Sequence, residues 1–96
     1  MPVTQASVEM PTPARYMARL CNHFTHRVTV HREEDRARIE FPNGLCSLRA
    51  TEQKLEMRIE ASDAATLDRL EQVVAKHLKQ VASAETFEVQ WVRSGG

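Results

Sequence analysis

Apolar residues recur along this chain with two spacings, one typical of helices and one typical of strands. Near the N-terminus they lie three and four positions apart, which predicts an amphipathic helix that begins at Pro13 and ends near His26. Thr12 is expected to cap this helix through its side-chain oxygen, and proline suits a first helical position. The apolar stripe consists of Tyr16, Met17, Leu20, Cys21 and Phe24.

A second helix is predicted after Ser62 and Asp63, because aspartate caps a helix and complements the positive end of its dipole. Its apolar positions again recur at helical spacing, and a histidine lies among them. The stripe consists of Leu67, Leu70, Val74, His77, Leu78 and Val81.

Alternation of apolar and polar residues predicts five strands, four between the two helices and one after the second helix. The sequence Pro42-Asn43-Gly44 predicts a turn, because Asn and Gly tolerate a positive φ and Pro fixes the corner. The predicted strands span residues 27–32, 36–41, 45–50, 55–61 and 87–92.

These elements predict an α+β domain with the order α-β-β-β-β-α-β. Because each helix has one apolar stripe and each strand one apolar face, we expect a two-layer sandwich with both helices on one face of a five-stranded antiparallel sheet. The strand order 5-1-2-3-4, counted along the chain, keeps all neighbouring strands antiparallel. Residues 12–93 form this single domain, with a flexible N-terminal tail at 1–11 and a C-terminal tail at 94–96.

The sheet face that the helices leave uncovered is predicted to be charged. Because basic and acidic residues are interleaved on it, a solvated surface with weak cross-strand ion pairs is favoured over a mixed charged binding face. The residues assigned to it are Arg27, His31, Arg36, Arg38, Glu40, Arg49, Glu56, Arg58 and Glu60.

Composition narrows the class of protein without indicating an activity. The 13 basic and 13 acidic residues balance, which argues against a nucleic-acid partner and against a basic membrane-binding surface. No apolar run is long enough to span a membrane, and residues 1–10 lack the features of a signal peptide, so a cytoplasmic location is expected. Cys21 and Cys46 are expected to be buried and unreactive.

Histidines are the candidate site residues. His77 lies inside the stripe of the second helix and His23 flanks that of the first, so we expect the two to approach each other in the seam between the helices. His31 alternates with Val30 and is expected on the surface.

A metal site is one interpretation of this seam. His26 follows His23 by three positions, so His23, His26 and His77 are candidate ligands for iron or zinc, whereas Cys21 diverges from His23 by about 200° around the helix. The favoured alternative is that His23 and His77 are partly buried and hydrogen-bonded to backbone or carboxylate groups, and a third is a small-ligand or acid–base site. Tyr16, seven residues before His23, completes the candidate ligand-binding set of His23, His26, His77 and Tyr16.

Four motifs follow one another along the chain. They are Arg-Tyr-Met with Leu-Cys-Asn-His-Phe-Thr-His-Arg within 14–27, Phe-Pro-Asn-Gly at 41–44, Val-Val-Ala-Lys-His-Leu at 73–78, and Trp91 in the last strand. Together they resemble the bacterial family catalogued as domain of unknown function 2218, over residues 12–91.

This resemblance implies no established activity. It implies that His23, His26 and His77 lie at motif positions of the family, and that a siderophore-interacting, flavin-dependent reductase is a partner, which points to iron handling. The chain departs from the family at 79–85, where the family has an Arg-Phe-x-x-Arg-Glu run. Arginines that hold an anionic ligand there would be absent from this protein.

The sequence therefore predicts a small cytoplasmic binding or accessory domain linked to iron–siderophore metabolism, with its site near His23 and His77. One alternative is a small enzyme that uses His77 or His23 for acid–base catalysis, although no paired carboxylate accompanies them. Another is a module that forms a homodimer through an edge strand or the sheet face and has no small-molecule site. A binding role is favoured over an enzymatic one.

Overall fold

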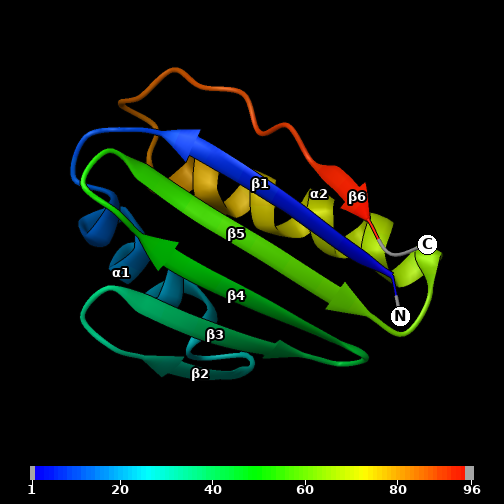
Figure 1. Cartoon of the computed structure of the whole chain (residues 1–96). Helices are drawn as coiled ribbons and strands as arrows, with labels where there is room; N and C mark the ends of the chain where they lie inside the picture. The colour runs from blue at the N-terminus through cyan, green and yellow to red at the C-terminus, as the bar shows by residue number, and fades with distance from the viewer. Residues whose placement is uncertain (1, 95–96) are drawn as a thin grey trace.

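A computed structural model describes residues 2–94 as a two-layer α+β sandwich (Figure 1). One layer is a six-stranded antiparallel sheet, and the other consists of two helices that lie behind it in this view. Helix α1 spans Pro13–Phe24 and helix α2 spans Ala64–Val81. The strands are β1 (Val3–Glu9), β2 (Thr29–Arg32), β3 (Arg36–Phe41), β4 (Gly44–Ala50), β5 (Lys54–Ala61) and β6 (Val92–Ser94).

Strands β2 to β5 form the predicted antiparallel meander. The register places Ile39 of β3 opposite Cys46 of β4, and Cys46 opposite Ile59 of β5. All three side chains are fully buried. Their alternation with outward-facing polar residues fixes the strand register, because a slip of one residue would turn this whole set away from the core.

The predicted flexible N-terminal tail is wrong for residues 3–9, which form strand β1. This strand pairs with β5 along its whole length, from Val3 opposite Glu60 to Glu9 opposite Lys54. Its inward residues are Thr4, Ala6 and Val8. Two of these are small or polar, so the alternation carries little apolar signal, and pairing with β5 decides the conformation.

The predicted strand order 5-1-2-3-4 is also wrong, because the sheet has six strands in the order β2-β3-β4-β5-β1-β6. The last strand was expected beside the first strand of the meander, but β6 pairs with β1 at the opposite side of the sheet. In Figure 1 the chain after α2 runs back along β1. Since β1 occupies the free side of β5, its own outer side is the edge that receives β6.

The last strand is shorter and lies later than predicted. Only Val92–Ser94 form β6, so Ser94 belongs to the sheet, and the remainder of the expected C-terminal tail lies outside the described residues. Within 87–91 the predicted alternation is still present, because Phe87, Val89 and Trp91 are half-buried against the core. This segment therefore packs as predicted without joining the sheet.

The two helices begin in different ways. Thr12 has a left-handed backbone with φ 47° and forms no side-chain cap, so the cap predicted for α1 is wrong. A side-chain cap needs an extended backbone at this position. Asp63 has that backbone, and its carboxylate accepts a hydrogen bond from the Thr66 amide at 2.7 Å, which confirms the cap predicted for α2. Helix α1 ends at Phe24 rather than near His26.

The core lies between the two layers. Helix α1 contributes Met17 and Leu20, and α2 contributes Leu67, Val74 and Leu78, all of them almost completely buried. Neither helix within residues 2–94 combines the length and the apolar character needed to cross a membrane.

Candidate functional site

His23 and His77 come together on the surface where α1 and α2 contact each other. The centroids of their rings are 4.4 Å apart, and the ring planes are inclined by 41°. His23 lies in the last turn of α1 and is exposed, whereas His77 is half-buried. The predicted approach of these two residues is confirmed.

Phe24 supports the histidine pair from the core side. Its buried ring meets His77 edge-on at 5.0 Å and His23 edge-on at 5.6 Å, measured between ring centroids. A further edge-on contact at 5.2 Å joins Phe24 to Phe41 of β3. The pair therefore lies at the rim of an aromatic cluster, with one side open to solvent.

His77 also has a defined hydrogen-bond partner. Its Nδ1 lies 3.2 Å from Oε1 of Gln80, one helical turn further along α2. An amide oxygen only accepts, so Nδ1 carries the proton and Nε2 keeps a free lone pair.

Burial lowers the pKa of His77, and the nearby His23 ring lowers it further. The charges of Lys76 and Arg27 act in the same direction, while the hydrogen bond to Gln80 partly offsets them. The neutral imidazole is therefore the favoured form of His77.

The three-histidine metal site is not formed by the described residues. No three His, Cys, Asp or Glu side chains within 2–94 are arranged so that they could hold a metal ion. His26 is exposed and lies beyond the end of α1. His31 is on the surface, as predicted, with its Nε2 2.6 Å from Oε2 of Glu40.

Tyr16 fastens the chain that follows α2 to helix α1. Its hydroxyl donates to Oε2 of Glu85 at 2.9 Å, and the Arg19 guanidinium lies 5.7 Å from the centroid of its ring. The hydrogen bond to Glu85 is the main reason why the pKa of Tyr16 is raised. The hydroxyl is therefore already engaged in a contact between elements.

Both cysteines are buried and free. Burial raises the pKa of the Cys21 thiol, and it raises that of Cys46 to about 12 with a smaller contribution from Cys21. Because the thiolate is the nucleophile and the metal ligand, these side chains have little reactivity at neutral pH.

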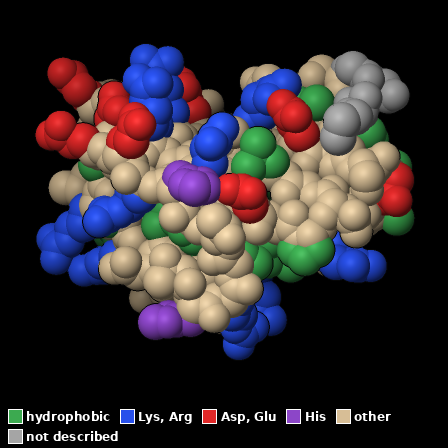
Figure 2. Space-filling model, turned by 90° about the horizontal axis from the view of Figure 1, so that it is seen from below, with side chains coloured by type: hydrophobic (Ala, Val, Ile, Leu, Met, Phe, Trp, Pro, Cys, Tyr) green, Lys and Arg blue, Asp and Glu red, His purple; other side chains and the backbone are tan. Residues whose placement is uncertain are grey.

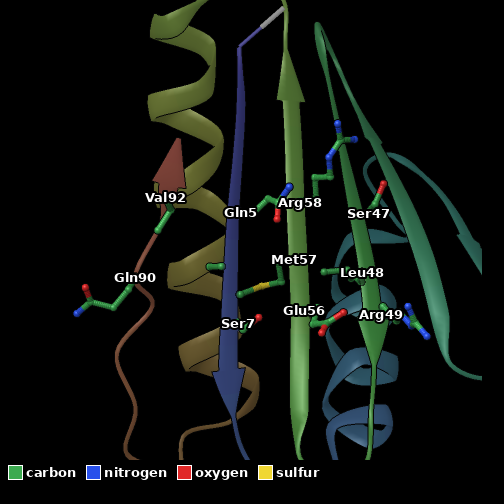
Figure 3. Close-up of a pocket in the computed structure, with 11 residues that line it drawn as sticks. Gln5, Ser7, Ser47, Leu48, Arg49, Glu56, Met57, Arg58, Gln90 and Val92 are labelled. Carbon is green, nitrogen blue, oxygen red and sulfur yellow. The ribbon is translucent and has the colours of Figure 1, made fainter. Parts of the chain in front are cut away.

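A second candidate site lies on the sheet face that the helices leave open (Figure 3). A hollow of about 490 Å³ lies over β1, β4 and β5. Its floor is the backbone at Ala6, Leu48 and Met57, whose side chains turn to the core. Gln90 and Val92 stand at one side of it. The side chains that rise around the floor are those of Gln5, Ser7, Ser47, Arg49, Glu56 and Arg58.

Ser47 is surrounded by arginines from three strands. Arg38 of β3 and Arg58 of β5 are its direct cross-strand neighbours. Arg49 lies two residues further along β4 and therefore projects from the same face. Side chains in such positions start about 5–7 Å apart, so three guanidinium groups are within reach of the space above one short side chain.

Acidic residues balance this cluster only in part. Arg58 is bonded to Glu60, and Glu56 stands opposite Arg49. Neither Arg38 nor Arg49 has an ion-pair partner in the part of the chain that the structure describes. Three arginines and two glutamates leave one unit of positive charge around Ser47.

The open sheet face as a whole carries charges of both signs, as predicted. Figure 2 views the molecule from below the orientation of Figure 1, and basic and acidic side chains lie intermixed along the upper part of that view. Of the residues assigned to the sheet face, Arg27 lies outside the sheet, because β2 begins only at Thr29.

Sequence reasoning placed Arg49, Glu56 and Arg58 on the open face correctly but missed the hollow. Gln5 and Ser7 were assigned to the tail, although their alternation with Thr4 and Ala6 has the period of a strand. That alternation is the signal that could have found them. Nothing in the sequence marked Ser47 and Gln90 as site residues, because short or neutral polar side chains are common on any solvent-exposed surface.

Comparison with known proteins matches the chain to a family model and to solved structures. The family model described as "Uncharacterized protein conserved in bacteria (DUF2218)" matches residues 5–92. The NMR structure of PA4090 from Pseudomonas aeruginosa is 32% identical in sequence, with a TM-score of 0.81 over 96% of each chain. No curated protein matches the chain. The chain therefore belongs to the DUF2218 family, as its motifs indicated, and PA4090 has a similar fold.

Proposed function

We propose that this member of the DUF2218 family is a binding domain that holds a small carboxylate-bearing molecule on the open face of its sheet. The observation that carries this proposal is the hollow of about 490 Å³ over β1, β4 and β5. Sites for small molecules are typically concavities of roughly 300–1,000 Å³, so the hollow is large enough for a metabolite-sized ligand.

The side chains around the hollow suit a carboxylate. Arginine binds carboxylates through two parallel charge-assisted hydrogen bonds, and the side chain of Arg49 has no ion-pair partner within 2–94 to compete. The single surplus positive charge around Ser47 favours a monoanion over a phosphate dianion. Ser7 and Gln5 add neutral hydrogen-bonding groups for the rest of the molecule.

An enzymatic role has less support from the same groups. Within the described residues, no hydrogen bond joins Ser7 or Ser47 to a histidine or a carboxylate, as an activated hydroxyl nucleophile needs. At the histidine pair, the partner of His77 is the Gln80 amide and not a carboxylate. Binding of a carboxylate, in contrast, needs neither an activated nucleophile nor a catalytic base.

The proposal does not include the link to iron and siderophores that the resemblance implied. Glu56 is the one preferred iron-ligand side chain among the residues around the hollow, and the comparisons name no siderophore or reductase. The cytoplasmic location stays a prediction from the sequence.

An NMR titration tests the proposal. The ¹⁵N-labelled full chain is titrated with small monocarboxylates, with inorganic phosphate and with uncharged amides of matched size. We expect saturable shifts of amide signals from β1, β4 and β5 with a carboxylate. Arg49→Gln should weaken this binding at least about tenfold, because it removes a charge-assisted hydrogen bond.

Arg69→Gln is the matched control, since Arg69 is an exposed arginine on α2, in the other layer of the molecule. Equal affinity of the two variants, or no shifts in these strands with any carboxylate, would overturn the proposal. Tighter binding of phosphate would also contradict it. Shifts at the same strands that depend on protein concentration alone would instead favour the dimeric module.

A further inference from the structure

We infer that His23 and His77 form an open, two-histidine site for a divalent ion of the zinc, nickel or copper type, which would link α1 to α2. The observation behind this inference is the approach of two imidazoles from different helices to a centroid distance of 4.4 Å. The site is separate from the sheet-face hollow, and the inference does not depend on the proposed binding of carboxylates.

His77 is held in the form that a metal ion needs. Histidine ligands commonly donate their second ring N–H to an oxygen, which fixes the tautomer and the orientation of the ring. The contact between Nδ1 of His77 and Oε1 of Gln80 provides this arrangement and leaves Nε2 free. The edge-on ring of Phe24 limits how far the imidazole can turn.

His23 can complete the site by a small rotation. Zn–N bonds of about 2.0–2.1 Å at a tetrahedral angle place two ligand nitrogens roughly 3.3 Å apart. Rings whose centroids are 4.4 Å apart can meet this distance by tilting their edges together. Because His23 is exposed, its side chain can turn without disturbing the core.

The donor set decides which ions are expected. Imidazole binds zinc, copper and nickel well, whereas magnesium and calcium prefer oxygen ligands. No third protein ligand is available among residues 2–94, so water or an added ligand must fill the remaining positions. The nearby charges of Lys76 and Arg27 oppose a cation, and salt weakens this repulsion because the site is open to solvent.

Calorimetry and thermal unfolding of the untagged full chain in physiological salt test the inference. With Zn²⁺ alone we expect one ion per chain and a higher melting temperature, because an ion that binds the folded state stabilises it. Magnesium and calcium should produce neither effect. An unchanged melting temperature and no heat of binding with Zn²⁺, Ni²⁺ or Cu²⁺ would overturn the inference.

Single substitutions locate the ion. His23→Ala and His77→Ala should each lower the affinity for Zn²⁺ at least roughly tenfold, while His26→Ala and His31→Ala, which also remove exposed histidines, should not change it. Because His23 is exposed, its variant is expected to keep the metal-free melting temperature. Equal loss in all four variants, or no loss with His23→Ala, would show that the ion binds elsewhere.

Ring ¹⁵N signals of His77 test the role of Gln80 as a positioning residue. We expect a protonated Nδ1 without metal and a shift at Nε2 when Zn²⁺ binds. Gln80→Ala should lower the affinity up to roughly tenfold and mix the two tautomers. A metal-induced shift at Nδ1, or an unchanged tautomer in the variant, would contradict the assigned geometry.

Discussion

In the hairpin between β3 and β4, Asn43 provides an unusual backbone conformation and Gly44 provides space for a neighbouring side chain. Asn43 has a positive φ of 63°, which asparagine tolerates better than most residues. Gly44 is needed for space. A Cβ atom there would lie 2.3 Å from Cδ1 of Leu70 and 3.1 Å from the backbone oxygen of Glu60. Because Gly44 has no side chain, Leu70 of α2 can pack directly against this corner of the sheet.

Replacement of Gly44 by alanine should lower the free energy of unfolding by about 1–3 kcal/mol, as overpacking of a close contact does. Chemical denaturation measures this change. Asn43→Gly is the control, because glycine adopts the same positive φ and adds no atom. If Gly44→Ala is as stable as the unmodified protein, the close approach of Leu70 to the turn is wrong.

At the scale of the elements, the start of each helix depends on backbone conformation as well as residue type. Threonine and aspartate are both good capping residues, yet only Asp63 accepts a hydrogen bond from its helix. The bond from the Thr66 amide is the main reason why the pKa of Asp63 lies below its ordinary value of 3.8. The cap therefore stabilises α2 fully only when the carboxylate is ionised.

The sign of this pKa shift predicts a pH dependence. A carboxyl group whose pKa is lowered by folding stabilises the protein above its unfolded pKa, near 4, and loses this contribution as the pH falls through the folded pKa. Asp63→Ala should thus lower the melting temperature by several degrees at pH 7 and by less at pH 3. Asp63→Asn should retain most of the stability at pH 7, since an amide oxygen also accepts. Equal losses for alanine at both pH values would contradict the cap.

The whole molecule depends on a pairing between segments far apart in the sequence. Strand β1 lies between β5 and β6, so the N-terminal segment joins the meander to the end of the chain. Arg93, the middle residue of β6, donates hydrogen bonds to Asp68 and Glu71 of α2. These bonds connect this edge of the sheet to the helix layer. Removal of β1 would expose both β5 and the core beneath it.

Two neighbouring residues of β1 test this arrangement. Val8 is 2% exposed, so Val8→Asn should lower the free energy of unfolding by at least about 2 kcal/mol, because it buries an amide in place of an apolar side chain. Ser7 points to solvent, and Ser7→Asn should change it by less than roughly 0.5 kcal/mol. Denaturant titration compares the two. Similar, small effects would favour the flexible tail that the sequence suggested.

The candidate sites were predictable to different degrees. The approach of His23 and His77 followed from helical spacing, because both stripes must face the same core. The failure of His26 to join them followed from the end of α1 at Phe24, which the pattern placed about two residues too late. The hollow depends on strands from three parts of the chain, and no local pattern contains that information.

The amino-acid sequence by itself determined the two helices, the four-stranded meander, the outward direction of its charged side chains and the family. Each of these depends on which side of a single element is apolar, and the spacing of the apolar residues along the element determines that side. Only the tertiary structure decided that residues 3–9 are a strand, that β6 lies beside β1, and that Ser47 has arginines around it. These features depend on pairing between distant segments, where the sum of many weak contacts outweighs the preference of any one segment.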